Sequence, residues 1–90
     1  MTTVSRTVTI TNRRGLHARA SAKFVTMASA LTARIEVAKD GAAVTGTSIM
    51  GLMMLGAAMG DQVTISAAGD EAEAALAQLV ALVEGKFGED

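Results

Sequence analysis

Short stretches in which apolar and polar residues alternate predict the strands of this chain. In the first stretch Val4, Val8 and Ile10 share one face with Arg6, while serine and threonine occupy the other face. Such alternation of β-branched residues is typical of a strand with one buried side. The charged Arg6 on the apolar side indicates an edge strand. We expect strands at residues 4–10, 33–38, 42–45 and 62–67.

Apolar residues spaced three and four positions apart predict three helices, at residues 18–29, at 49–54, and from 72 to just before Gly85. The first helix has a predicted apolar stripe made of Ala18, Ala22, Val25 and Ala28 or Ser29, widened by Phe24 and Met27. The last helix has a predicted stripe made of Ala72, Leu76, Leu79, Val80 and Val83.

The segments between these elements carry turn and capping signals. Asp40 and Gly41 form a pair that strongly favours a two-residue hairpin between the second and third strands. Ser48 is a candidate N-cap for the short second helix, and Gly56 is its candidate stop. Residues 85–90 are expected to form a short polar tail.

The element order is therefore β-α-β-β-α-β-α. Split βαβ units of this kind form an antiparallel sheet with helices packed on one face. The predicted fold class is α+β, an open-faced β-sandwich with a four-stranded antiparallel sheet and three helices on one face. We expect a single domain spanning residues 1–90.

Composition narrows the range of functions. Eight basic and nine acidic residues give a net charge of −1, which argues against a nucleic-acid binder that needs a basic face. One histidine and no cysteine exclude disulfides, zinc–thiolate sites and histidine metal clusters. The chain lacks both an apolar signal core and a run of about 20 apolar residues. We expect a cytoplasmic protein with no membrane insertion.

The first candidate site is the segment Gly15-Leu16-His17-Ala18-Arg19, at the predicted start of a helix. Helix N-termini present unpaired N–H groups and a partial positive charge, so they bind phosphate well. Ala18, Arg19 and Ala20 supply those N–H groups, and the Arg19 guanidinium can hold two phosphate oxygens. Neutral imidazole is also a good nucleophile near pH 7. His17 is therefore a candidate acceptor of a phosphoryl group, through a ring nitrogen that the sequence does not identify.

A simpler interpretation of this segment is a loop histidine or a helix cap, which is the commoner role of a single histidine beside a glycine. Arg19 is electrostatically unfavourable in a first helical turn, because cations prefer helix C-termini. An unfavourable local choice points only weakly to a functional purpose.

The second candidate segment is the short helix that follows Ser48. Six of the eight residues from Ile49 to Gly56 are large and apolar, and so short a helix cannot bury all of them against one sheet. We expect Ile49, Met50 and Met53 to stay partly exposed, as flexible methionines suit a surface that accepts several partners. A methionine-rich core is the competing interpretation, chiefly for Met54 and Leu55.

Both segments resemble motifs of the HPr family, the histidine-phosphorylated carriers of the bacterial phosphotransferase system. Residues 15–22 are similar to the family's active-centre motif, except that Ala20 replaces a common proline. The resemblance implies that enzyme I phosphorylates His17 on Nδ1, using phosphoenolpyruvate, and that the group then passes to an enzyme IIA domain. Arg19 inherits the role of charge partner, and a carrier of this kind is expected to need no metal or bound cofactor of its own. With Ala20 we expect altered transfer rates rather than loss of function.

The segment from Ser48 to Gly56 resembles the family's regulatory-serine region. The resemblance implies that Ile49, Met50 and Met53 dock enzyme I and enzyme IIA, through small and transient interfaces of a monomer. Ser48 matches the serine that an HPr kinase phosphorylates in some lineages. The family often has Lys or Arg just before that serine, whereas this chain has Thr47. The role of helix cap is therefore the safer interpretation of Ser48.

Two other functions compete with a phosphoryl carrier. One is a regulatory module that binds an anion or ligand through His17 and Arg19 without covalent chemistry, because fold alone does not fix function. The other is a small acyl-phosphate hydrolase, which is disfavoured because no second polar residue is obviously placed to position a water. Among carriers, the alanine-rich composition, Ala20 and Thr47 slightly favour the nitrogen-related regulatory branch over sugar transport.

Overall fold

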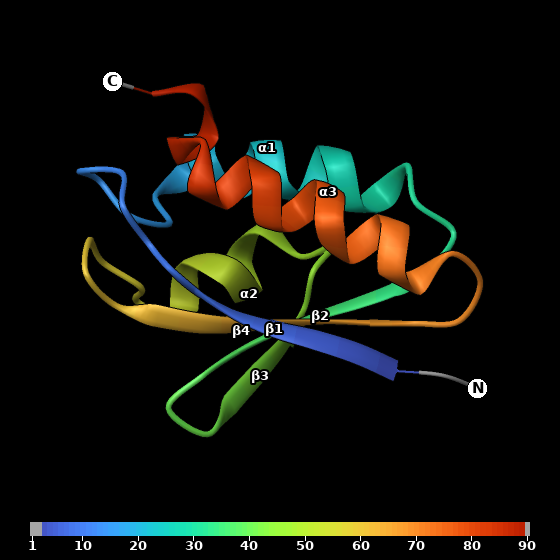
Figure 1. The fold of residues 1–90 in the computed structure, drawn as a ribbon. Coiled ribbons are helices and arrows are strands. Elements are labelled where there is room, and N and C mark those ends of the chain that lie inside the picture. Colours follow the sequence, from blue (N-terminus) through green and yellow to red (C-terminus); the bar gives the residue numbers. More distant parts are fainter. Residues whose placement is uncertain (1–2, 90) are drawn as a thin grey trace.

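A computed structural model describes residues 3–89 and has the element order predicted from the sequence (Figure 1). A 3₁₀ turn follows the last helix and was not predicted. The elements are β1 (Thr3–Thr9), α1 (Ala18–Ser29), β2 (Arg34–Lys39), β3 (Ala42–Thr45), α2 (Ile49–Met54), β4 (Gln62–Ala68), α3 (Ala72–Glu84) and η1 (Lys86–Gly88).

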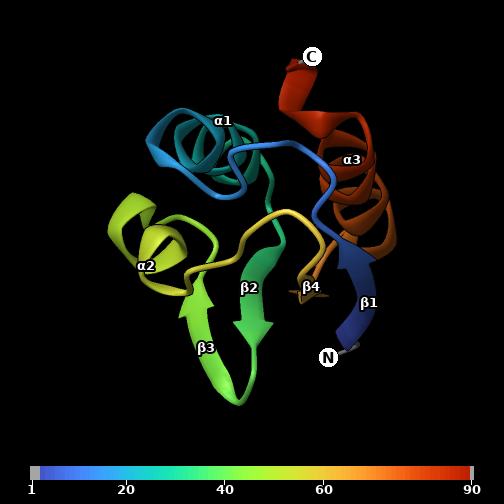
Figure 2. The same ribbon diagram turned by 90° about the vertical axis from the view of Figure 1, so that its left-hand side faces the viewer.

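The four strands form one antiparallel sheet in the order β1-β4-β2-β3. The helices lie on one face of this sheet, with α1 and α3 side by side and α2 below α1 (Figure 2). The predicted open-faced α+β architecture is therefore confirmed. Strand β1 is an edge strand, as the exposed Arg6 on its inner side indicated.

The predicted hairpin between β2 and β3 is also confirmed. Asp40 and Gly41 both have positive φ, at 50° and 86°, and the flanking Lys39 and Ala42 are paired. Two consecutive positive φ values are what a two-residue type I′ hairpin requires.

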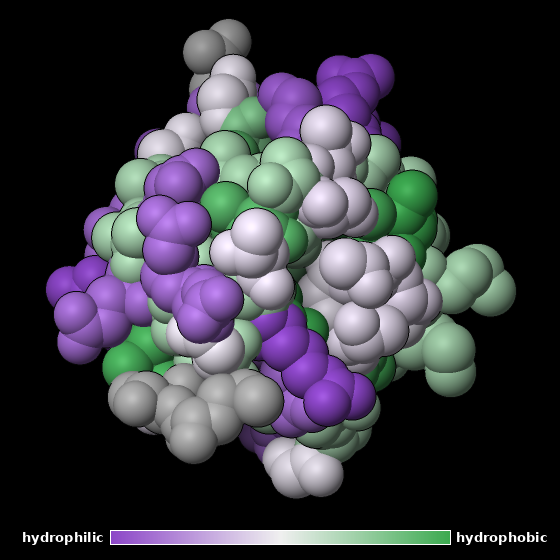
Figure 3. Space-filling model, turned by 90° about the vertical axis from the view of Figure 1, so that its right-hand side faces the viewer, coloured by the Kyte–Doolittle hydropathy of each residue, from purple (hydrophilic) through white to green (hydrophobic). Residues whose placement is uncertain are grey.

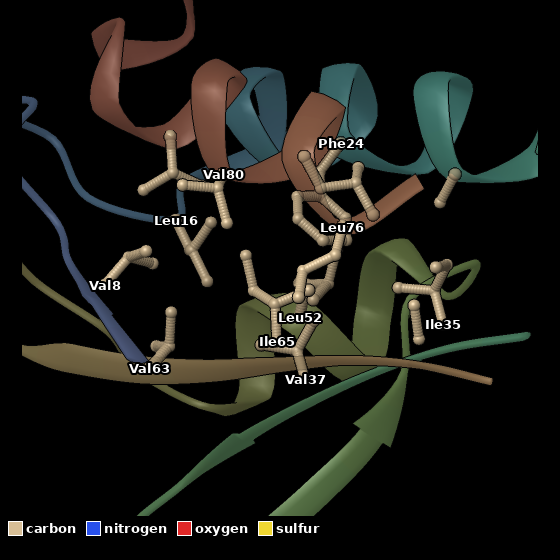
Figure 4. Close-up of a cluster of buried hydrophobic side chains, with 14 of the residues drawn as sticks. Val8, Leu16, Phe24, Ile35, Val37, Leu52, Val63, Ile65, Leu76 and Val80 are labelled. Atoms are coloured by element: carbon tan, nitrogen blue, oxygen red, sulfur yellow. The ribbon is translucent and has the colours of Figure 1, made fainter. Parts of the chain in front are cut away.

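The core lies between the sheet and the helices (Figure 4). Alternate residues of the strands point upward into it, among them Val37 and Ile65, and Leu52 reaches it from α2. The predicted stripe of α3 is buried throughout, from Ala72 to Val83. Apolar burial of this kind is the main stabilising contribution in so small a domain.

The buried face of α1 differs from the predicted one. Ala18 is exposed, and the helix turns Ala20, Ser21, Phe24 and Ala28 toward the core. Alanines occur on both sides of this helix and give little orientation, so the large Phe24 side chain decides which face is buried. The hydroxyl of Ser21 is satisfied on that face, because it donates to the carbonyl of Leu16 at 3.2 Å.

The segment after α3 is not the polar tail that the sequence suggested. Phe87 is only 1% exposed and belongs to the core, although both Lys86 and Phe87 have positive φ. Lys23 of α1 donates from Nζ to the carbonyl oxygen of Phe87 at 2.7 Å. Burial of a large aromatic ring outweighs the strain of left-handed residues, so the segment folds back onto α1.

Figure 3 shows one face on which hydrophilic and hydrophobic residues are interspersed. Within residues 3–89, no helix combines the length and the apolar composition needed to cross a membrane.

Replacing Phe87 with Ala is expected to lower the free energy of unfolding by about 3–5 kcal/mol, because a buried aromatic side chain leaves a cavity. Replacement with Leu keeps most of the apolar volume and should cost about 1–1.5 kcal/mol. Urea denaturation followed by circular dichroism measures both. A loss below about 1 kcal/mol for Phe87→Ala would show that the segment is not part of the cooperative core.

Candidate functional site

His17 lies at the start of α1, where the sequence placed it. It is the N-cap residue, with φ −73° and ψ 179°, and its carbonyl accepts the first helical hydrogen bond from Ser21. Its ring turns back over the helix end, so that Nδ1 accepts a hydrogen bond from the backbone N–H of Arg19 at 3.3 Å. The imidazole therefore faces the positive end of the helix.

A close backbone approach fixes the loop that carries His17. Gly15 has φ +63°, and a Cβ added there would lie 2.3 Å from the carbonyl oxygen of Ala57. The next residue, Leu16, is buried and donates its N–H to that same oxygen at 2.9 Å. Only glycine fits this position, and the residues before His17 are held against the segment after α2.

The second ring nitrogen of His17 has a partner that the sequence did not reveal. Nε2 lies 2.5 Å from Oε2 of Glu89, and both side chains are 17% exposed. The other carboxylate oxygen, Oε1, accepts a hydrogen bond from Nδ2 of the buried Asn12 at 3.1 Å. Asn12 also donates to the carbonyl of Gly15 at 2.8 Å. The carboxylate is thus held by the same loop that positions the histidine.

Electrostatics favour a charged Glu89. The hydrogen bond with His17 is the strongest influence and holds the pKa of the Glu89 carboxyl below its ordinary value. Partial burial opposes this lowering of the pKa, whereas Asn12 and the positive charge of Lys23 add to it. The side chain facing Nε2 is therefore a carboxylate at neutral pH.

The first turn of α1 offers its backbone donors unequally. Ala18 and Arg19 are exposed, whereas Ala20 has an exposed fraction of 0%. A group attached to His17 therefore meets the N–H groups of Ala18 and Arg19 more readily than that of Ala20. Arg19 is exposed at the protein surface, and a guanidinium can hold an anion.

Ser48 caps the second helix as expected. Its Oγ accepts a hydrogen bond from the N–H of Gly51 at 3.0 Å, and α2 begins at Ile49. Gly56, with φ +65°, follows the helix end. An N-cap side chain of this kind stabilises a helix by about 1 kcal/mol.

The apolar surface predicted on α2 is present. The exposed fractions are 41% for Ile49, 71% for Met50 and 43% for Met53, while Leu52 is fully buried. Met54 is 80% exposed, so the alternative of a methionine-rich core is wrong for it, although Leu55 does pack against the core. Because α2 lies beside α1 (Figure 2), this apolar surface adjoins the helix that carries His17.

Comparisons with known proteins show the family to which the chain belongs. A family model described as "PTS HPr component phosphorylation site" matches residues 4–85. The chain belongs to the HPr family. It is 41% identical to the phosphocarrier protein HPr of Cupriavidus necator, covering 96% of this chain and 97% of that protein. It is 42% identical to the phosphocarrier protein NPr of Shewanella violacea, covering 99% and 98%. These two relatives, one HPr and one NPr, match at almost equal identity.

The fold is likewise that of solved HPr structures. HPr-C-His from Thermoanaerobacter tengcongensis superimposes with a TM-score of 0.90 at 48% identity, covering 100% of this chain and 99% of that one. An HPr from the same organism was solved as a dimer; it has a TM-score of 0.77 and 49% identity, covering 91% and 94%. The HPr family comprises phosphocarrier proteins of the phosphotransferase system.

Gly15→Ala and Gly56→Ala form a matched pair that tests the loop. Both residues have a φ near +65°, but a Cβ at Gly56 meets nothing within 4 Å. The positive φ alone should cost about 1–2 kcal/mol in each variant. The clash with Ala57 should add about 1–3 kcal/mol at Gly15 only. Equal losses in thermal denaturation would contradict the close approach.

Removing the ring partner should raise the pKa of Glu89. In His17→Ala the largest cause of the lowered pKa is gone, so the carboxyl should titrate closer to its ordinary value, as followed by NMR of the side-chain carboxyl carbon. A carboxyl whose pKa is lowered in the folded protein stabilises the fold at pH values above its ordinary pKa. This stabilisation is lost as the pH falls through the lowered pKa. If the pKa of the Glu89 carboxyl is the same in His17→Ala as in the parent, the contact between the two side chains does not form in solution.

Proposed function

We propose that the chain is a phosphocarrier in which Nδ1 of His17 accepts a phosphoryl group from enzyme I and passes it to an enzyme IIA domain. One observation carries this proposal: the lone pair of Nδ1 points at the exposed N-terminus of α1, where the N–H of Arg19 already meets it. A phosphoryl group on Nδ1 therefore forms next to backbone donors and a helix dipole.

The surroundings of His17 support both halves of a carrier's task. An imidazole with its lone pair on Nδ1 is a nucleophile toward phosphorus. After transfer, the exposed N–H groups of Ala18 and Arg19 and the Arg19 guanidinium stabilise the phosphate oxygens. The side chain of His17 remains 17% exposed, so it can meet a donor and an acceptor in turn.

The exposed face of α2 supports docking of partner proteins beside His17. Ile49, Met50 and Met53 are apolar, exposed and carried on a helix that is anchored by Leu52. Methionine side chains adapt to different partner surfaces. Enzyme I and an enzyme IIA domain would use this face in succession, through small interfaces that separate quickly.

Ser48 adds a proposed point of regulation by an HPr kinase. Its partly exposed hydroxyl caps α2, and a phosphate there stays at a helix N-terminus, where negative charge is favourable. The same phosphate stands next to Ile49 and places two negative charges beside the apolar docking face. It would therefore weaken docking without unfolding the helix.

The carrier proposal is tested by incubation with enzyme I and labelled phosphoenolpyruvate. The chain should acquire an acid-labile, alkali-stable label, because phosphohistidine has that stability, and His17→Ala should acquire none. A folded parent that stays unlabelled with a competent enzyme I would favour the non-covalent anion-binding module instead. Release of free phosphate from acyl phosphates by the chain alone would favour the hydrolase.

The docking face is tested with Met50→Glu, which places a charge within the apolar surface. Its KM with enzyme I should rise about fivefold or more, corresponding to at least about 1 kcal/mol. Ala77→Glu adds the same charge on the exposed face of α3 and should leave the KM unchanged. An equal effect of both variants would indicate a general charge effect and contradict docking on α2.

A further inference from the structure

We propose that Glu89 is a positioning residue for phosphoryl transfer: it holds the proton of His17 on Nε2, leaves Nδ1 free to attack, and stabilises the charge that the ring acquires. This inference rests on the proposed function of His17 as the acceptor. It adds a partner for the ring that lies 72 positions away in the chain.

The two contacts of the ring specify one tautomer. A carboxylate only accepts hydrogen bonds, so Nε2 must donate to Glu89. A backbone N–H only donates, so Nδ1 must accept from Arg19. Both contacts therefore require a neutral ring with its proton on Nε2 and its lone pair on Nδ1. The helix end alone favours a lone pair on Nδ1, and Glu89 adds the complementary acceptor on the other nitrogen.

Glu89 is held in place by contacts on several sides. Its Oε1 accepts from the buried Asn12, whose amide also donates to Gly15. Two residues before it, Phe87 is buried in the core and its carbonyl accepts from Lys23. Because none of these contacts involves Nδ1, the carboxylate is positioned before the reaction and needs no rearrangement during it.

The chemical step gives Glu89 a further role. When Nδ1 attacks, the N–P bond forms and the bond between phosphorus and the donor breaks, its electron pair leaving with the donor. The proton on Nε2 stays, so the ring becomes a cation. Its Nε2–H remains donated to the Glu89 carboxylate, and this negative charge stabilises the cation, as a carboxylate does for histidine in hydrolase triads. Onward transfer reverses these changes and returns a neutral ring.

Glu89→Gln tests both roles, because Gln has the same shape but a single acceptor oxygen. Either Asn12 or His17 must then face an NH₂ group. Where that group faces the ring, Nε2 becomes an acceptor and the proton moves to Nδ1, the atom needed for attack. Glu84→Gln removes the same charge at an exposed position of α3 and is the matched control.

The first measurement is the tautomer of the unphosphorylated protein at alkaline pH, from long-range ¹H–¹⁵N correlations of the ring. We expect the proton on Nε2 in the parent and in Glu84→Gln, and an increased share on Nδ1 in Glu89→Gln. The amide shifts of Phe87 and Gly88 report whether the segment stays docked. This readout does not depend on phosphorylation, so it stands apart from the labelling of His17.

The second measurement is the rate of phosphorylation by enzyme I. Loss of a charge-assisted hydrogen bond should slow Glu89→Gln about tenfold or more, with Glu84→Gln at the parent rate. A Glu89→Gln protein with a docked segment that keeps the parent tautomer and is also phosphorylated at the parent rate would overturn the inference. If enzyme I does not phosphorylate the parent protein, the proposed function is overturned instead, whichever ring nitrogen of His17 carries the proton.

Discussion

The close approach of Gly15 to Ala57 is the constraint on which the site depends. It brings the loop after β1 against the segment after α2, and α1 then begins at Ala18, with His17 as its N-cap. A helix that begins one residue earlier would place the imidazole within its first turn, and one that begins one residue later would carry it away from the free N–H groups. Everything that the histidine can do, as a nucleophile or as an anion site, follows from this fixed start.

The same loop also receives the chain's C-terminal segment. Asn12 uses one amide nitrogen for two acceptors, the carbonyl of Gly15 and the carboxylate of Glu89. A buried amide of this kind is costly unless it is hydrogen-bonded, so the loop and the segment stabilise each other's conformation. The two ring nitrogens of His17 are then contacted by parts of the chain that are far apart in sequence but share this one buried side chain.

Most of the fold could be predicted from sequence because its signals are local. The alternation in β4, the Asp40-Gly41 turn and the Ser48 cap each follow from neighbouring residues. The exposed face of α2 followed from a count, since six large apolar residues exceed what one short helix can bury. The contact between His17 and Glu89 has no such local signal. It depends on where Phe87 packs, and a phenylalanine within a polar stretch does not reveal its own position.

The backbone of that segment indicates why the contact persists. Lys86 and Phe87 adopt positive φ in succession, which costs of order 1–3 kcal/mol at each residue. Such strain survives only where the surroundings over-determine it, and here Phe87 is buried and Lys23 holds its carbonyl. The left-handed pair reverses the chain after α3 and directs the next residues toward α1. The strain in this turn is thus offset by the core, and its geometric result is a carboxylate placed against the ring of His17.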